Sequence, residues 1–438
     1  MIGRARRLAI ACGLFCIGVA CGEPEPVARA QLLLVVATDA PIPRAGLTAD
    51  DVVLFDRLRI AVYRNGEDAP CAGCVRDFVL ATDRADRAIS AGIARESDEA
   101  VAFVALYAER NRDRFGAPDA GSALSAWIHL PVPSEHEVRP LQVTLTMNDL
   151  GRPLGSRDAP IETNAAPPMP LARWAGARRA PCAASPRADE ACVPGGVVWM
   201  GSALRSPGAS AGLPPRLVSL SPFLVDVHEV TVADFRASAL AEDHGPGTDS
   251  DPAHDTGSAV CTYSPLPGPD EGLPVTCITH YLARTYCRAR GKDLPTEAQY
   301  EYLQGGLRGA RYPWGDDDPS CTDAVFGRDR ERLGPCGLSG FGPRLPGSGA
   351  RDVLVLGGIG VTDLAGNVSE WARERHADED APCHAPGHHL DPVCEGSGMF
   401  VARGGAFVDP PLGLRSEVRF PSPSHNEVIG FRCVRAIE

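Results

Sequence analysis

The sequence predicts a loop-rich protein of two domains, the first of them a β-sandwich, and three observations support this prediction. Its length of 438 residues exceeds what one hydrophobic core usually serves. Short runs of apolar residues separated by turn signals occur in the first 160 residues, whereas two helices are indicated only from residue 279 onward. The 40 prolines and 46 glycines favour a loop-rich architecture over a helical one.

The N-terminus has the features of an export signal over residues 1–21. Arginines within residues 4–7 form a basic region, and the apolar run of residues 8–19 is too short to span a hydrocarbon core of ~30 Å comfortably. The run ends in Gly-Val-Ala-Cys, which resembles a bacterial lipobox with glycine where leucine is usual. We expect a lipid on Cys21 that anchors the protein in the cell envelope (outer membrane, periplasm or cell surface), with a simple secretory signal as the alternative. Residues 22–30 would form a tether.

Residues 31–160 are expected to form a β-sandwich. Two strands are indicated by apolar patterns at residues 31–37 and 58–63, and Asn65-Gly66 supplies a hairpin-type turn. Further strands are expected at residues 78–80, 100–107 and 141–147. Short strands with turns between them are typical of a sandwich. This segment has no cluster of His, Asp and Glu and no glycine-rich phosphate loop, so we expect a spacer or a protein–protein module.

The cysteine content agrees with export. Of the 15 cysteines, three lie within or at the end of the signal, and the other twelve form an even set. An even set in an oxidising compartment predicts disulfides. Cys71 and Cys74 are expected to form a local disulfide, with a zinc site as the alternative. Cys182 and Cys192 are expected to close a loop in a linker over residues 161–192, which is rich in Ala, Pro and Arg.

The charge of the chain excludes one class of partner. Its formal net charge is −13 at pH 7, and the acidic residues are scattered along the sequence. A nucleic-acid-binding protein needs a basic surface to neutralise phosphates, so we expect no nucleic-acid partner. Scattered acidic residues are typical of a solvated surface.

Two helices are predicted in the second half of the chain. Residues 279–290 have an apolar stripe and stop at Gly291, as helices often stop at glycine. The next helix is expected to begin at Thr296, because its hydroxyl and the side chain of Gln299 can form a capping box. The distinctive sequence of residues 294–302 is therefore interpreted as a helix N-terminus with its cap.

A series of short motifs occurs in the remaining sequence. They are Val193–Ser202, Phe223–Thr231, Leu294–Tyr302, Asp363–Trp371, Ala402–Phe407 and Gly430–Arg435. Together and in this order they resemble the sulfatase-modifying-factor family, whose founding member is the formylglycine-generating enzyme. The resemblance covers residues 193–438. It implies a C-type-lectin-like α+β fold with much irregular structure.

The resemblance does not extend to the family's chemistry. The founding enzyme oxidises a substrate cysteine with two copper-binding cysteines between its Arg-Gly-Gly and Gly-Phe-Arg motifs, but residues 407–431 contain no cysteine. Copper(I) prefers sulfur ligands, so copper is not expected. Ala406 and Ser369 also replace the usual serine and tryptophan, and Arg432 is expected to have a structural role. The domain is therefore interpreted as a binding or structural module, with no catalytic residue assigned. The alternative is a divergent metal-dependent oxidoreductase acting on a peptide or small molecule, so enzyme status stays open.

The resemblance also implies a calcium site. The family holds Ca²⁺ through positions that match the Asp363 side chain, the Gly366 and Val368 carbonyls, and Glu370. Oxygen ligands packed this closely suit Ca²⁺. A capped turn without an ion is the alternative. A second calcium site of the family needs an asparagine where Val325 stands, so it is not expected here.

Two further cysteine pairs complete the expectations. Cys287 and Cys433 match positions that form a disulfide in the formylglycine-generating enzyme. Residues 383–394 contain three histidines, an aspartate and two cysteines, which could bind zinc or copper. An exposed loop closed by a Cys383–Cys394 disulfide is the favoured interpretation. The partner is expected to be a protein or peptide whose identity the sequence does not give.

Overall fold

The computed structural model describes most of the chain from residue 30 onward. The described residues are 30–64, 66–80, 89–94, 99–134, 136–163, 173–203, 213–240, 261–264, 266–423 and 426–437. The predicted signal, Cys21, most of the predicted tether and Asn65 therefore lie outside the described residues. Within these ranges no helix is both long enough and apolar enough to cross a membrane.

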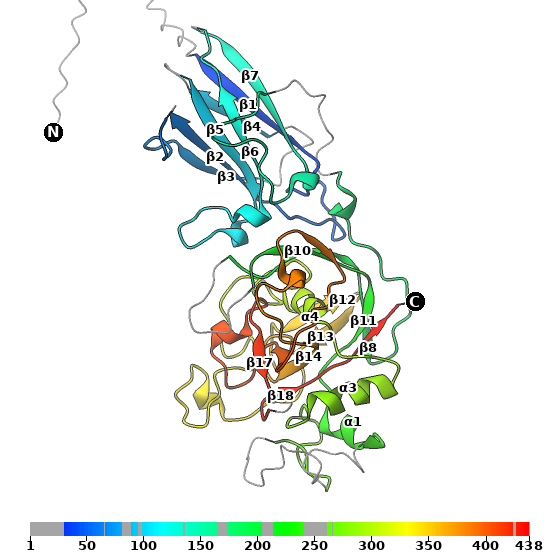
Figure 1. Cartoon of the computed structure of the whole chain (residues 1–438). Helices are drawn as coiled ribbons and strands as arrows, with labels where there is room; N and C mark the ends of the chain where they lie inside the picture. The colour runs from blue at the N-terminus through cyan, green and yellow to red at the C-terminus, as the bar shows by residue number, and fades with distance from the viewer. Residues whose placement is uncertain are drawn as a thin grey trace, which may run out of the picture.

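The N-terminal half consists of two sheets (Figure 1). One has the strand order β4-β1-β7 and the other the order β3-β2-β5-β6. Their strands are β1 (Gln31–Thr38), β2 (Arg57–Arg64), β3 (Val75–Val79), β4 (Ile89–Ala94), β5 (Ala100–Tyr107), β6 (Leu124–Leu130) and β7 (Val138–Leu145). Strand β1 pairs with β7 in parallel and with β4 antiparallel, whereas the second sheet is antiparallel throughout. Buried side chains from both sheets form one hydrophobic cluster.

The C-terminal half is a mixed α/β domain built from short elements. Its strands are β8 (Glu190–Val193), β9 (Gly196–Met200), β10 (Arg216–Leu220), β11 (Phe223–Asp226), β12 (Val353–Leu356), β13 (Ile359–Thr362), β14 (Ser369–Arg375), β15 (His388–Leu390), β16 (Phe400–Arg403), β17 (Phe420–Ser422), β18 (Ile429–Gly430) and β19 (Val434–Ala436). They form sheets of order β15-β10-β9, β19-β11-β8, β12-β13 and β17-β16-β14-β18. Strand β8 overlaps the segment expected to be a linker and pairs with β11.

The helices in the described residues are few, as expected. They are α1 (Val232–Arg236), α3 (His280–Ala289) and α4 (Glu297–Gln304), with 3-10 turns η1 (Glu109–Asn111), η2 (Ala120–Ser122), η3 (Met147–Asp149), η4 (Ala175–Ala177), η5 (Gly337–Ser339), η6 (Pro382–His384) and η7 (Pro411–Leu414). Thr296 caps α4 and forms the predicted capping box with Gln299. Thr279 caps α3. Between α4 and β12 the described residues contain one 3-10 turn and otherwise irregular structure.

The two halves share part of their core. Trp199 on β9 packs edge-on against Phe55 at a centroid distance of 5.7 Å, and its indole Nε1 donates to the Leu54 carbonyl at 2.8 Å. Val197 and Leu217, which also belong to the C-terminal half, are buried in the cluster of the N-terminal sheets. The two halves are therefore joined by apolar packing as well as by the chain.

Six disulfides bind the fold together. The structure contains the four expected bonds, Cys71–Cys74, Cys182–Cys192, Cys287–Cys433 and Cys383–Cys394. It also pairs Cys261 with Cys277 and Cys321 with Cys336. Every cysteine in the described residues is thus disulfide-bonded. The Cys71–Cys74 bond excludes the alternative of a zinc site at that pair, because both sulfurs are used.

Candidate functional site

The loop that begins at Asp363 lies in the interior of the C-terminal domain, between β13 and β14. Two of its residues have left-handed backbone conformations, with φ angles of 56° at Asp363 and 61° at Asn367. Asp and Asn tolerate this region better than most residues. Gly366 has a φ of 126°, and a Cβ there would lie 2.6 Å from the Val325 carbonyl oxygen. Only glycine fits that position, so part of this motif is explained by backbone geometry alone.

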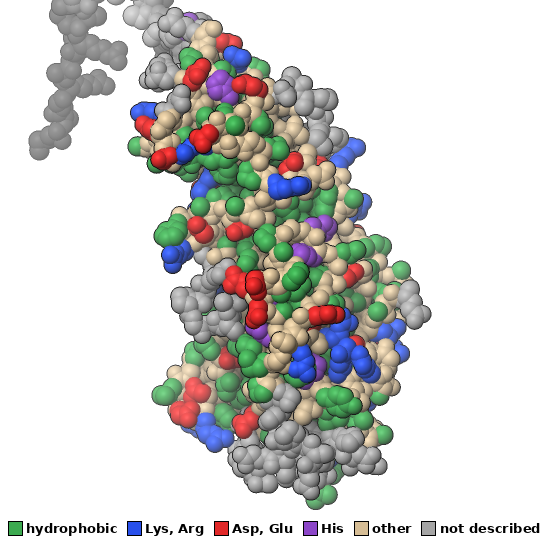
Figure 2. Space-filling model, viewed as in Figure 1, with side chains coloured by type: hydrophobic (Ala, Val, Ile, Leu, Met, Phe, Trp, Pro, Cys, Tyr) green, Lys and Arg blue, Asp and Glu red, His purple; other side chains and the backbone are tan. Residues whose placement is uncertain are grey.

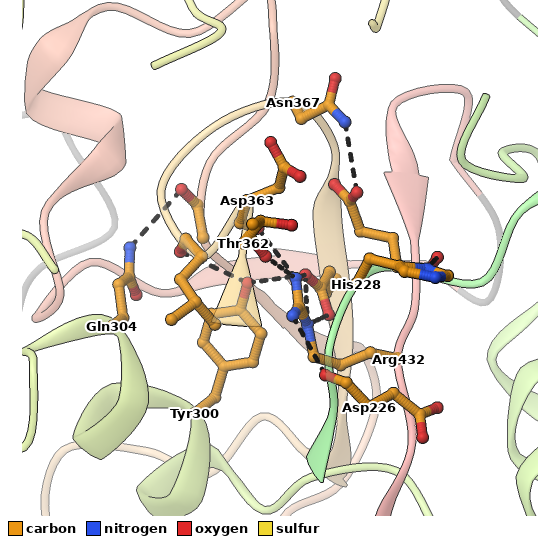
Figure 3. Close-up of polar contacts among 12 residues, drawn as sticks. Asp226, His228, Tyr300, Gln304, Thr362, Asp363, Asn367 and Arg432 are labelled. Carbon is orange, nitrogen blue, oxygen red and sulfur yellow. Dashed lines mark hydrogen bonds and ion pairs between the residues drawn. The ribbon is translucent and has the colours of Figure 1, made fainter. Parts of the chain in front are cut away.

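Glu370 on β14 and Arg432 form a fully buried ion pair next to this loop. Figure 3 shows Arg432 beside Thr362, Asp363 and Tyr300. Arg432 Nε lies 2.9 and 2.8 Å from the two carboxylate oxygens, and its Nη2 lies 2.6 Å from Oε1. The Tyr300 hydroxyl donates to the same Oε1 at 3.0 Å. Arg432 Nη2 also donates to the carbonyls of Thr362 and Asp363, each at 2.9 Å. This confirms the structural role expected for Arg432.

Four buried carboxyl groups, Glu370 and three others, gather around Arg432. Burial raises the pKa of Glu229 well above its ordinary value, and the charges of Asp363 and Glu370 add to the rise. Burial and the charge of Asp363 raise the pKa of Asp352 to about 8. Burial also raises the pKa values of Asp363 and Glu370. Arg432 is the arginine that opposes this rise in all four groups, so one arginine is shared by four acidic groups, which favours their protonation.

Two oxygens of these carboxyl groups have no hydrogen-bond partner among the described residues. They are Glu229 Oε1 and Asp363 Oδ1, both on residues that are at most 1% exposed. The other oxygen of Glu229 accepts from Asn367 Nδ2 at 3.2 Å, and the other oxygen of Asp363 accepts from the Gly347 amide. Buried polar atoms are almost always satisfied, so this arrangement suits a cation.

The expected calcium ligands would donate oxygens from residues that are all buried here. Asp363 offers its unpartnered Oδ1, and Gly366 and Val368 lie buried beside it. Glu370 Oε2 accepts from Arg432 Nε, which leaves it a lone pair for a metal. Oxygen donors of this kind suit Ca²⁺. Glu229 was not anticipated from the sequence, where it follows β11 within a motif that indicated only a strand leading to a helix.

The segment where the family has its copper cysteines holds no sulfur. Phe407 and Leu414 are completely buried, and Leu414 packs in a small cluster with Tyr312 and Phe326. Asp409 Oδ2 accepts from the Ala406 amide at 2.7 Å, and burial raises the pKa of Asp409. Because every described cysteine is in a disulfide, the described residues contain no thiol to complete a copper site there.

Other family-like motifs serve the scaffold. Glu297 on α4 binds Arg419 Nη2 at 3.0 Å, and Glu301, one turn along, binds Arg403 of the Arg-Gly-Gly motif. All four side chains are buried. The predicted helix start is confirmed, and the glutamates of the same motif additionally attach α4 to β16 and to the segment before β17.

The histidines near Cys383 do not converge on a metal. His384 Nε2 lies 3.1 Å from Cys394 Sγ, but that sulfur is bonded to Cys383. His388 instead contacts Ser219, and His389 contacts the Ala385 carbonyl. His384 is 1% exposed, and burial lowers its pKa to about 4. The disulfide is confirmed, but the expectation of an exposed loop is wrong for His384, which packs inside.

Comparisons with known proteins identify the family of the C-terminal half. A family model described as the sulfatase-modifying factor enzyme 1-like domain matches residues 179–437. The "Inactive C-alpha-formylglycine-generating enzyme 2" of Bos taurus is 28% identical over 287 residues, which are 55% of this chain and 86% of that protein. The formylglycine-generating enzyme of Thermomonospora curvata is 28% identical over 261 residues, 49% of this chain and 81% of that protein. The solved structure of PvdO from Pseudomonas aeruginosa aligns with a TM-score of 0.40 and 19% identity over 57% of this chain and 94% of that one.

Proposed function

Because the chain belongs to the sulfatase-modifying factor enzyme 1-like family, we propose that its C-terminal domain is a binding or structural module without the cysteine-dependent oxidase activity of the founding enzyme. One observation carries this proposal: residues 407–431 contain no cysteine, and every described cysteine is in a disulfide. The relatives named as inactive formylglycine-generating enzymes from Bos taurus and Mus musculus support the same proposal.

The chemistry of the replaced segment supports this proposal. Copper(I) selects soft sulfur ligands, whereas the polar side chain in this segment is the carboxyl of Asp409, a hard oxygen ligand. Phe407 and Leu414 offer no ligand atom and are buried as packing residues. The segment therefore contributes to the core of the domain, and a partner would be bound by the surface of the domain.

We expect no turnover of a sulfatase-type peptide with the sequence Cys-x-Pro-x-Arg. The full chain would be incubated with this peptide, copper and oxygen, and formylglycine would be measured by mass spectrometry. An active formylglycine-generating enzyme, assayed in parallel on the same peptide, is the positive control. Formylglycine formed by this chain above the level without protein would refute the proposal.

We further propose that a Ca²⁺ ion stabilises the loop that begins at Asp363. The two unpartnered carboxyl oxygens and the four buried carboxyl groups that share one arginine support it. The ligands would be the Asp363 side chain, the Gly366 and Val368 carbonyls and Glu370, with Glu229 close enough to add its charge. Without a cation, the carboxyl groups would have to take up protons to stay buried.

Removal of calcium is expected to destabilise the protein. A ligand that binds only the folded state stabilises it by about 2.7 kcal/mol at a concentration one hundred times its Kd. We expect the Tm to fall when calcium is chelated and to recover when calcium is restored. Asp363→Ala should abolish this response, whereas Asp363→Asn, which keeps an oxygen ligand, should retain part of it.

The measurements are differential scanning calorimetry and isothermal titration with calcium chloride. A chelator-treated protein with an unchanged Tm and no binding heat would contradict the calcium site. Metal analysis of the purified protein distinguishes a binding or structural module from a metal-dependent oxidoreductase. Calcium alone supports the binding module, whereas stoichiometric copper or iron on nitrogen ligands would favour the divergent metal-dependent oxidoreductase.

We also propose that the protein is exported and anchored in the cell envelope by a lipid on Cys21. The basic and apolar segments before this residue and the even set of cysteines support the proposal. The N-terminal sheets would form a β-sandwich spacer that presents the C-terminal domain to a protein or peptide ligand. Cys21→Ser is expected to move the protein from the membrane fraction to the soluble fraction, and an unchanged distribution would count against the anchor.

A further inference from the structure

A cleft of about 760 Å³ lies between the two halves of the protein. One wall comes from the N-terminal half, from residues 53–56 and from the loop after β5, residues 108–116. In Figure 1 this loop, which contains η1, extends from the N-terminal sheets toward the C-terminal domain. The other wall comes from residues 308–316 and 415–417. The first wall lies outside the family match at residues 179–437, so the cleft is particular to this two-domain arrangement.

The cleft is rich in arginine in a chain whose net charge is −13. The arginines that line it are Arg110, Arg112, Arg114, Arg308, Arg311 and Arg415, and the acidic residues are Asp56, Glu109, Asp113, Asp316 and Glu417. Most of these acidic groups already have partners. Glu109 binds Arg57 and Arg112, and Asp113 accepts from two backbone amides. Asp56 accepts from the Glu109 amide and Asp316 from the Arg311 amide.

Two donor atoms of these arginines have no acceptor among the described residues. Arg110 Nη2 donates across the domain boundary to the Gly201 carbonyl at 3.1 Å, but its Nη1 is buried without a hydrogen-bond partner among the described residues. Arg415 Nε is likewise buried without a hydrogen-bond partner in the described part of the chain. Gly309, with a φ of 67°, lets Arg110 approach, because a Cβ there would clash with Arg110 Nη1. A buried donor left without an acceptor is energetically unfavourable.

The cleft also has a flat aromatic surface. Trp314, which lines it, is half-buried and stacks on Tyr312 with a centroid distance of 4.8 Å and an interplanar angle of 6°. The volume of the cleft lies in the range of ~300–1,000 Å³ that small-molecule sites occupy, and such sites often lie between domains. Arg351 also lies over the Trp314 ring, with its Cζ 5.8 Å from the centroid. An apolar group of a ligand would pack on the part of the ring that Tyr312 and Arg351 leave uncovered, while its charged end reaches the arginines.

We propose that this cleft binds a small ligand that carries an oxyanion, a carboxylate or a phosphate, on an aromatic or apolar body. The oxyanion accepts hydrogen bonds from Arg110 and Arg415, for which it supplies the missing acceptors. The exposed side chains of Arg308 and Arg311 add attraction for the negative charge. The ligand would contact neither the calcium loop nor a donor atom of residues 407–414, so this proposal can be tested independently of the proposals above.

The test is titration of the full chain, purified in detergent, with three probes: inorganic phosphate, phenyl phosphate and phenylacetate. Binding would be followed by isothermal titration and by tryptophan fluorescence, because Trp199 and Trp314 both line the cleft. Phenyl phosphate should bind at least tenfold more tightly than inorganic phosphate if the aromatic body packs on Trp314. The comparison of phenyl phosphate with phenylacetate identifies which oxyanion is preferred.

Arg110→Gln and Arg415→Gln should each weaken phenyl phosphate binding tenfold or more. Arg112→Gln is the matched control, because Arg112 lines the same cleft but is already bonded to Glu109 and the Gly116 carbonyl; its effect should stay below twofold. Arg308→Gln, at an exposed position, should cause a loss of two- to fivefold without affecting folding. No binding of any probe at millimolar concentration, or equal losses in Arg112→Gln and Arg415→Gln, would overturn the proposal.

Discussion

Replacement of Arg432 by methionine should destabilise the protein by roughly 3–5 kcal/mol, the loss measured when one member of a buried ion pair is removed. The substitution leaves the Glu370 carboxylate without its counter-charge in a position with no exposure to water. It also removes the hydrogen bonds to the Thr362 and Asp363 carbonyls that hold the start of the loop. Methionine fills a similar volume, so the expected loss comes from charge and hydrogen bonding and not from a cavity.

The matched control is Arg435→Met. Arg435 lies three residues further along, at the C-terminal strand β19, and pairs with Glu190 at 2.6 Å while its own side chain is 26% exposed. Glu190 keeps a second partner, Lys292 at 3.0 Å. We expect a loss of about 1 kcal/mol or less, as for exposed pairs. Both variants would be unfolded in urea under oxidising conditions, and equal losses would show that Arg432 has no special role.

The double variant Cys287→Ala/Cys433→Ala should lose about 5 kcal/mol, the value that the chain-entropy relation gives for a loop of this length. The two cysteines are 146 residues apart in the sequence, and both side chains are completely buried in the cluster that includes Tyr286 and Phe431. The bond joins α3 to the segment that carries Arg432. Its loss therefore raises the conformational entropy of the unfolded chain. It also removes a covalent link that holds the segment with Arg432 in position.

Cys71→Ala/Cys74→Ala provides the comparison for this variant. These cysteines are separated by 3 residues, lie in a turn of the N-terminal half, and close so short a loop that the same relation gives about 2 kcal/mol. Denaturant unfolding followed by tryptophan fluorescence would measure both losses. If the short-range pair proved as costly as Cys287 and Cys433, loop length would not explain the stabilisation.

The local features of the fold could be predicted from the sequence. The capping box at Thr296 and Gln299 involves residues three apart, and the strands at residues 31–38 and 100–107 have continuous apolar patterns. Strand β4 was not anticipated, because its sequence Ile-Ser-Ala-Gly-Ile-Ala has low strand propensity and it is specified by pairing with β1. Strand β8 has only four residues, too few to show a pattern, and is likewise specified by its partner β11.

The candidate site was less predictable because its contacts are long-range. The proposed loop ligands Asp363 and Glu370 could be inferred from a motif of eight residues that resembles the family. Glu229, in contrast, reaches Asn367 across 138 residues, and Arg432 reaches Glu370 across 62. No spacing in the sequence encodes these pairs. Only the fold shows that four carboxyl groups lie together with one arginine.

The insertion of Trp199 into the N-terminal core bears on how this protein can be dissected. A recombinant fragment cut at residue 179, where the family match begins, would keep Trp199 but lose Phe55 and the Leu54 carbonyl that receive its indole. Its wide apolar ring would then face solvent together with Val197 and Leu217, a surface prone to self-association. The complementary N-terminal fragment would have an unfilled hole where these side chains belong. The family boundary in the sequence is therefore not a place where the molecule can be divided into two autonomous pieces.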